Sequence, residues 1–296
     1  MAHRHSPARV DSGRLVVVLC LSLAVLAVEL IGGLAANSLA LLADAGHVLA
    51  DVVGMLVVLV AIWIGSRPAS SERTFGYLRV EILAAVLNAG LLFAVAAFIL
   101  YEAWRRFSEP PVVVSGLMLA VALFGLVVNG ISLWLLRDAQ ARSLSMRGAY
   151  LEVLGDLAGS AAAVIAAAVI AVTGLNGADI VASVVIALLI LPRTWRLLKD
   201  AIDVLLEATP GGIDMGEVRT HILSARGVAD VHDLHAWSIT SGVNVVSAHV
   251  VLDAGAEPAA VLDELCSCLS GDFDIEHSTF QLETRDRRRL EAATHG

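Results

Sequence analysis

Six long apolar stretches constrain this chain more than any other feature of its sequence. A bilayer core about 30 Å thick is spanned by a helix of roughly 20 apolar residues. The stretches are residues 15–35, 39–64, 82–104, 112–136, 150–172 and 178–191. We expect each to form a transmembrane helix. The sixth is the shortest, and we expect Pro192 to close it because proline interrupts the hydrogen bonds of a helix.

The overall composition supports a membrane protein. Of the 296 residues, 57% are hydrophobic and 17% are charged, and the mean hydropathy is +0.78. A soluble domain is about 45–50% apolar and about 25% charged. The composition therefore excludes a disordered chain, a fibrous repeat and a typical cytosolic enzyme.

Charge is concentrated in the C-terminal part of the chain. Residues 1–207 carry 14 Lys and Arg against 15 Asp and Glu, whereas residues 208–296 carry 6 against 14. An acidic tail argues against a nucleic-acid partner and favours an interaction with cations. The three cysteines, Cys20, Cys266 and Cys268, provide no disulfide framework, which suits a reducing compartment.

The basic residues predict the orientation. With the N-terminus in the cytoplasm, the inner segments carry twelve Lys and Arg and the outer loops carry only Arg105 and Arg106. Inner loops of membrane proteins are enriched in these residues. We therefore expect both termini in the cytoplasm and the protein in the cell inner (plasma) membrane.

The tail has the pattern of a small α+β domain. Beyond the Pro210–Gly212 turn we expect helix 215–225, strands 228–239 and 243–252, helix 259–269 and strand 273–283. This αββαβ unit of about 75 residues is small for independent stability, so we expect it to pack as a dimer. The predicted parts are a cytoplasmic N-terminal tail (1–14), an all-α six-helix transmembrane domain (15–207), a cytoplasmic domain (208–285) and a flexible C-terminal tail (286–296).

Two of the predicted spans carry pairs of ionisable residues. His47 and Asp51 are four residues apart in span two, as are Glu152 and Asp156 in span five. This spacing places each pair on one helix face. A charge at the centre of a span costs at least about 2.5–3.5 kcal/mol on insertion scales, so such residues are usually functional. One imidazole and three carboxylates suit a divalent ion such as zinc.

Two alternatives apply to these polar residues. The pairs could form a structural network between helices, although buried ion pairs stabilise less than apolar packing. Asp44 faces roughly the same side as His47 and is a possible access-path residue. For Glu29 and Asn129, interhelical hydrogen bonds are favoured over a place in a pathway. Three carboxylates without a cation repel one another, so protons and metal would compete for the same groups.

Three segments resemble the cation diffusion facilitator family. Residues 37–51, NSLALLADAGHVLAD, resemble its second-span signature, and residues 75–81, FGYLRVE, its entry to span three. Residues 227–250, which include HDLHAW, resemble its cytoplasmic domain. The likeness covers residues 15–283 and is greatest to the bacterial zinc/cobalt/cadmium efflux branch.

The resemblance implies a homodimer with a ferredoxin-like cytoplasmic domain that exports Zn²⁺ or a similar ion in exchange for protons by alternating access. It maps the transport site onto the two pairs described above. Many zinc members have His where this chain has Glu152, which leaves selectivity among Zn²⁺, Cd²⁺ and Co²⁺ open. No other cofactor is implied.

The resemblance also implies a zinc site in the cytoplasmic domain. The matching positions are His232, His249 and Glu283, and His277 lies one residue out of register with a position that often carries His. Strand alternation places His235, three residues after His232, on the opposite face. Cys266 and Cys268 point about 200° apart on a helix, so they are not expected to chelate one ion together.

Other function classes remain as alternatives. The protein could export mainly Co²⁺, Cd²⁺ or Fe²⁺, or it could be a membrane metal sensor, although nothing in the chain resembles a signalling module. An intramembrane metalloprotease would need a motif such as His-Glu-x-x-His, which the sequence lacks. We therefore expect a transporter and no enzyme.

Overall fold

A computed structural model of the chain describes residues 12–138, 140, 144–275 and 277–290. Its contacts divide the chain into two units. The first runs through Val57 and from Leu87 to Leu197, and the second comprises residues 58–86 and those from Leu198 onward. Residues 1–11 of the predicted N-terminal tail (1–14) lie outside the described residues. Residues 291–296, at the end of the predicted C-terminal tail, do so as well.

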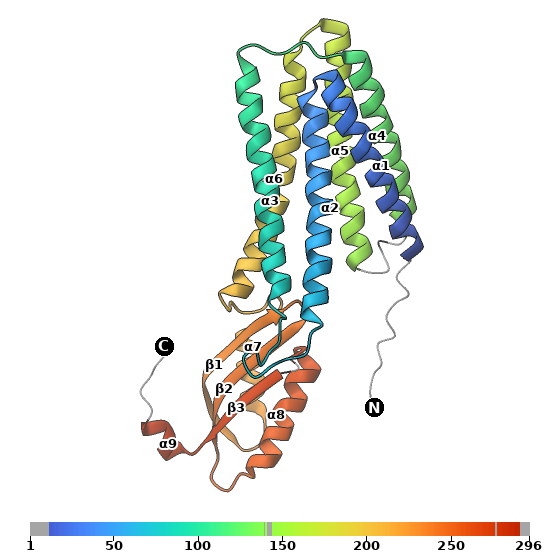
Figure 1. Ribbon diagram of the computed structural model, residues 1–296. Coiled ribbons are helices and arrows are strands. Elements are labelled where there is room, and N and C mark those ends of the chain that lie inside the picture. The colour runs from blue at the N-terminus through green and yellow to red at the C-terminus, as the bar shows by residue number, and fades with distance from the viewer. Residues whose placement is uncertain (1–11, 139, 141–143, 276, 291–296) are drawn as a thin grey trace. The chain divides into compact units, whose positions relative to one another are not determined.

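Six long apolar helices confirm the prediction of six spans (Figure 1). Each is long and apolar enough to cross a membrane. They are α1 (Ser12–Ala36), α2 (Leu39–Gly65), α3 (Val80–Phe107), α4 (Ser115–Leu136), α5 (Leu144–Thr173) and α6 (Gly177–Leu205).

Helix α6 does not end at Pro192. It continues to Leu205, so the predicted end of the sixth span is wrong. A proline removes only one backbone donor, and neighbouring helices and hydroxyl side chains make this tolerable in a membrane helix. In the same turn the Thr194 hydroxyl donates to the carbonyl of Ile190 at 3.0 Å. As a result Arg193 lies within a helix and not in a loop.

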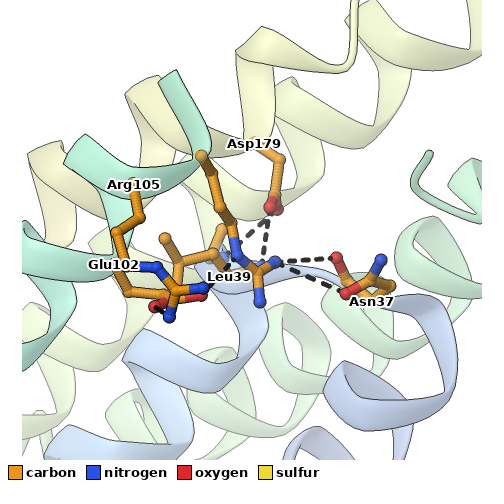
Figure 2. Close-up of polar contacts among 7 residues, drawn as sticks. Asn37, Leu39, Glu102, Arg105 and Asp179 are labelled. Atoms are coloured by element: carbon orange, nitrogen blue, oxygen red, sulfur yellow. Dashed lines mark hydrogen bonds and ion pairs between the residues drawn. The ribbon is translucent and has the colours of Figure 1, made fainter. Parts of the chain in front are cut away.

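The start of α2 is held by Asp179, in the first turn of α6 (Figure 2). Its buried carboxylate accepts hydrogen bonds from the Ser38 hydroxyl at 2.6 Å, the Leu39 amide at 2.6 Å and the Ala40 amide at 3.2 Å. Asn37 before them has a positive φ of 55°, which makes the sharp turn from α1. Asp179 therefore acts as a helix cap supplied by another helix.

Small side chains dominate the buried part of the helical unit. Ala40, Ala122 and Ala163 are fully buried, whereas Ile31 and Phe98 are exposed. Small residues let membrane helices approach closely, and large apolar side chains on the outside suit contact with lipid. This packing brings the polar faces of α2 and α5 together.

The second unit contains the predicted αββαβ domain. Its elements are α7 (Met215–Ser224), β1 (Val228–Thr240), β2 (Val243–Leu252), α8 (Pro258–Asp272) and β3 (His277–Glu283), followed by α9 (Arg285–Leu290). The sheet order is β1-β2-β3, with β1 antiparallel and β3 parallel to β2. The predicted α+β fold class is confirmed, and α9 lies where the flexible tail was expected to begin.

Both long helices of this domain cover the same face of the sheet. Apolar residues of α7 and α8 share one buried core with alternate residues of β2: Val218, Ile222, Val261, Leu265, Leu269, Val246, Ala248 and Val250. Successive residues of a strand point to opposite faces. The residues between these on β2, including His249, therefore face away from the helices.

Candidate metal sites

The ionisable pairs of α2 and α5 meet in the helical unit. His47 Nε2 lies 3.4 Å from Asp51 Oδ2 on its own helix and 3.6 Å from Asp156 Oδ1 on α5. His47 and Asp156 are 8% and 6% exposed. The structure therefore places His47 between the two carboxylates, as the spacing of the pairs predicts.

Glu152, the fourth predicted ligand, pairs with Arg193. Arg193 Nη2 lies 3.3 Å from Glu152 Oε2. This partner was not anticipated, because Pro192 was expected to end the sixth span before it. The sequence feature that could have indicated this pair is Arg193 itself, a basic residue at the edge of the sixth apolar segment.

These carboxylates border one cavity. Asp51, Glu152 and Asp156 line a space of about 320 Å³ whose other walls are largely apolar, among them Leu19 and Val48. Within the described residues, the Nδ1 atom of His47 and the Oδ1 atom of Asp156 are buried without a hydrogen-bond partner. A buried polar atom left unpaired costs about 1–3 kcal/mol. A cation or a proton at this position would relieve that cost.

A second buried polar group lies between α1, α2, α4 and α5. The Ser160 hydroxyl donates to Asp44 Oδ2 at 3.2 Å, and the Asn129 amide donates to Ser160 Oγ at 3.2 Å. The interhelical hydrogen bond expected for Asn129 is confirmed. Glu29 is fully buried on α1 and its side chain interacts with that of Asp44 on α2, so it too takes part in a polar contact between helices. Asp44 is 2% exposed, which places it inside the bundle.

In the cytoplasmic domain, His232, His249 and Glu283 come together. One ligand atom from each lies within 4.8 Å of the others. Glu283 Oε2 is 3.3 Å from His232 Nε2, and Glu283 Oε1 is 2.9 Å from His249 Nδ1. His232 on β1 pairs with His249 on β2, and Glu283 on β3 pairs with Val251 on β2. All three side chains face away from the helices.

His277 lies apart from this cluster. It begins β3 beside Val245, and its ring packs edge-on against Phe75 at 5.7 Å. Glu283 is six residues further along the strand, and a strand rises about 3.3 Å per residue. The two side chains are therefore roughly 20 Å apart, too far to share an ion.

The prediction that His235 faces away from His232 is wrong. His232 pairs with His249 and His235 with Ser247, so β1 has one extra residue in this stretch. Such a bulge shifts the alternation by one position. Asp233 has a φ of 50° there, and its carboxylate lies 3.0 Å from His235 Nε2 and 3.8 Å from His249 Nε2. Asp233 therefore lies next to the cluster of His232, His249 and Glu283, a position that strand periodicity did not predict.

Comparisons with known protein families cover almost the whole chain. A model described as cation efflux transmembrane domain matches residues 15–206, and one described as cation efflux protein, cytoplasmic domain, matches residues 210–285. The chain belongs to the cation efflux family. It is accordingly a multi-pass membrane protein that exports metal cations, and its relatives are transporters, not enzymes.

Several bacterial relatives of this cation efflux protein are similar over nearly their full length. The metal cation efflux system protein CzcD of Cupriavidus metallidurans is 45% identical over 99% of this chain and 93% of that protein. A cadmium, cobalt and zinc/H(+)-K(+) antiporter of Bacillus subtilis is 41% identical over 87% of this chain and 84% of that protein. The zinc transporter ZitB of Escherichia coli is 38% identical over 96% of this chain and 93% of that protein.

One solved structure is also similar. It is described as the metal-bound C-terminal domain of the CzcD transporter from Cupriavidus metallidurans. It is 44% identical, covers 24% of this chain and 99% of that chain, and has a TM-score of 0.23.

The cytoplasmic cluster of this cation efflux protein has a donor set suited to a resident zinc ion. Two imidazoles and one carboxylate are common zinc ligands. The Gln281 amide donates to Glu283 Oε1 at 2.6 Å and so orients the carboxylate. A zinc ion held by His232, His249 and Glu283 would tie the three strands together on this face.

Proposed function

We propose that this cation efflux protein exports Zn²⁺ from the cytoplasm in exchange for protons, and that His47, Asp51, Glu152 and Asp156 bind the transported ion. The observation that carries the proposal is the position of His47, 3.4 Å from Asp51 and 3.6 Å from Asp156 on a different helix. An imidazole between carboxylates from two helices suits four-coordinate zinc. The names of the relatives ZitB and the cadmium, cobalt and zinc antiporter support the same cargo.

Exchange follows from the chemistry of these groups. Imidazole and carboxylates bind either a proton or a metal ion, so arrival of Zn²⁺ releases protons and a high external proton concentration releases Zn²⁺. Arg193 lies 3.3 Å from one oxygen of Glu152, so its positive charge competes with the cargo for this carboxylate.

The transport cycle we propose is alternating access in a homodimer. Residues 15–207 form the transport domain, and residues 208–285 form a cytoplasmic domain that contributes to dimer packing. The excess of basic residues in the inner segments supports cytoplasmic termini and insertion in the inner (plasma) membrane. Zinc at His232, His249 and Glu283 would then act on the cytoplasmic side, where it reports the metal supply.

The choice of ion rests on one position. Glu152 supplies an oxygen ligand, and oxygen makes a site harder than imidazole does. Export mainly of Cd²⁺, Co²⁺ or Fe²⁺ is therefore the closest alternative, and a metal sensor without transport is the alternative from another class.

Flux in reconstituted vesicles tests the proposal. Purified full-length protein in proteoliposomes with an acidic lumen should accumulate Zn²⁺, and the lumen should become more alkaline as protons leave in exchange. Asp51→Ala and Asp156→Asn should abolish uptake. Asp138→Asn, an exposed acidic position at the end of α4, should transport normally.

Each outcome separates the alternatives. Uptake by Asp51→Ala at the wild-type rate would remove the proposed site. Zinc binding without flux in the wild type would favour the sensor. Faster flux of Cd²⁺ or Co²⁺ than of Zn²⁺ at two external pH values would change the cargo but keep the site.

A further inference from the structure

The C-terminal ends of α7 and α8 bring together three side chains that the transport mechanism does not use. They are His221, Cys268 and Asp272, and one ligand atom of each lies within 4.8 Å of the others. His221 Nε2 is 3.4 Å from Asp272 Oδ2, and Cys268 Sγ is 3.8 Å from the same oxygen. The imidazole, the thiol and the carboxylate thus converge on one point.

Two helices position these groups. His221 lies in the last turn of α7, and Cys268 and Asp272 lie four residues apart in the last turns of α8, on one helix face. The C-terminal end of a helix carries partial negative charge, so two such ends favour a cation. Cys266 contacts Ser278 on β3 and does not join the group, as the helical spacing predicts.

The histidine is oriented as a ligand would be. Its Nδ1 atom lies 3.3 Å from the backbone carbonyl of Glu217. A carbonyl oxygen only accepts hydrogen bonds, so a ring that donates to it from Nδ1 would present Nε2, on the Asp272 side, to a metal ion. Metal-binding histidines usually have such a partner on their other nitrogen. Phe273 packs edge-on against the ring at 4.9 Å and restricts its rotation.

The distances are close to those of a zinc site. Metal–ligand distances of about 2.0–2.3 Å in a tetrahedron place ligand atoms roughly 3.3–3.8 Å apart. The two measured separations from Asp272, 3.4 and 3.8 Å, fall in this range. The remaining separation, between the sulfur and the imidazole nitrogen, is within 4.8 Å. Because all three residues are partly exposed, water can take the fourth position.

We propose that His221, Cys268 and Asp272 form a second cytoplasmic metal site, which takes Zn²⁺ or Cd²⁺. A thiolate ligand favours these ions over harder ones. The site lies on the helical side of the sheet, whereas His232, His249 and Glu283 face the opposite side. It is therefore a separate site, and it does not depend on the transport site.

The thiol gives the site a measurable property. Partial burial, together with the negative charge of Asp272, raises the pKa of Cys268 above its usual value. The metal-free thiol is therefore protonated at neutral pH, and metal binding releases its proton. A bound ion would join the ends of α7 and α8 and stabilise the domain when cytoplasmic zinc is abundant.

Protection of Cys268 from alkylation tests the site in the full-length protein. N-ethylmaleimide modification of each cysteine is followed by peptide mass spectrometry, with and without Zn²⁺, in a His232→Ala/His249→Ala background. At a free Zn²⁺ concentration about ten times the Kd, modification of Cys268 should slow about tenfold, because about one site in eleven is metal-free. Cys266, two residues away, is the internal control and should react at an unchanged rate.

Two variants connect protection with the proposed ligands. His221→Ala and Asp272→Asn remove side chains at the partly exposed surface and should abolish protection of Cys268. Equal slowing of Cys266 and Cys268 would indicate a general tightening of the domain and overturn the site, as would an unchanged rate at Cys268. If the double-alanine background does not fold, the same comparison is made in the wild type, where a Cd²⁺–thiolate absorption band that is lost in Cys268→Ser supplies the second measurement.

Discussion

Arg193 on α6 lies 3.3 Å from Glu152 on α5 and holds one of the four proposed ligands of the transported ion. The pair exists because α6 continues past Pro192 and carries the guanidinium to the neighbouring helix. A cation that binds Glu152 in this site competes with another positive charge. The strength of that competition becomes a property that substitution can change.

Replacement of Arg193 by Gln should tighten zinc binding. Both side chains are partly exposed, at 55% and 33%, so the pair is worth at most about 1 kcal/mol, which corresponds to about a fivefold lower Kd. Titration of purified protein with Zn²⁺ measures the change. Arg196→Gln, on an exposed position of the same helix, is the control and should leave the Kd unchanged. Weaker binding in Arg193→Gln would show that Arg193 supports the site.

Gly159 on α5 should not tolerate even a methyl group. A Cβ there would lie 2.7 Å from Asp44 Oδ1, which is buried and hydrogen-bonded to Ser160. We expect Gly159→Ala to destabilise the protein by about 1–3 kcal/mol, as overpacking does, and to reduce zinc flux. Thermal unfolding in detergent and proteoliposome uptake measure the two effects.

Gly155→Ala, one turn earlier on α5, is the matched control. A Cβ at Gly155 meets no atom within 4 Å, and alanine favours a helix over glycine by about 1 kcal/mol. This variant should be as stable as the wild type or more stable. Equal damage from both substitutions would mean that Asp44 is not confined by α5.

Loss of the Asp179 carboxylate should loosen the start of α2. Asp179→Ala removes three hydrogen bonds at the first turn and leaves buried donors unpaired, which should cost about 1–3 kcal/mol. A lower unfolding temperature in detergent is the expected result. Ser38→Ala removes one of the three donors to Asp179 and the acceptor of the Leu41 amide, but it keeps the two backbone hydrogen bonds to Asp179 and should have a smaller effect. An unchanged unfolding temperature in Asp179→Ala would show that α2 does not depend on this cap.

Asp233 should contribute charge to the cytoplasmic cluster without being needed for the fold. Asparagine adopts a positive φ as readily as aspartate, so Asp233→Asn should keep the bulge. Loss of the carboxylate beside His249 should weaken zinc binding at this site, measured by competition with a chelator in the Cys268→Ser background. Asp233→Ala places an unsuited residue at a φ of 50° and should destabilise the domain by about 1–2 kcal/mol. Zinc affinity equal to the wild type in Asp233→Asn would exclude any role in binding.

Local patterns in the sequence determined much of this protein. The length of the apolar stretches predicts six spans, because the membrane thickness sets the helix length. The spacing of four residues puts His47 with Asp51 and Glu152 with Asp156 on helix faces, because a helix repeats every 3.6 residues. Period-two and helical patterns likewise predict the αββαβ tail. These features depend on neighbours along the chain, so the sequence alone is enough.

Contacts between distant segments were decided only by the tertiary structure. Helix α6 passes Pro192 because surrounding helices stabilise it, and only then does Arg193 reach Glu152. The extra residue in β1 places His235 on the same face of the sheet as His232, whereas strand periodicity predicted the opposite face. His221 meets Cys268 and Asp272 only when α7 and α8 pack on one face of the sheet. Each depends on side chains brought together by folding, which no spacing along the chain encodes.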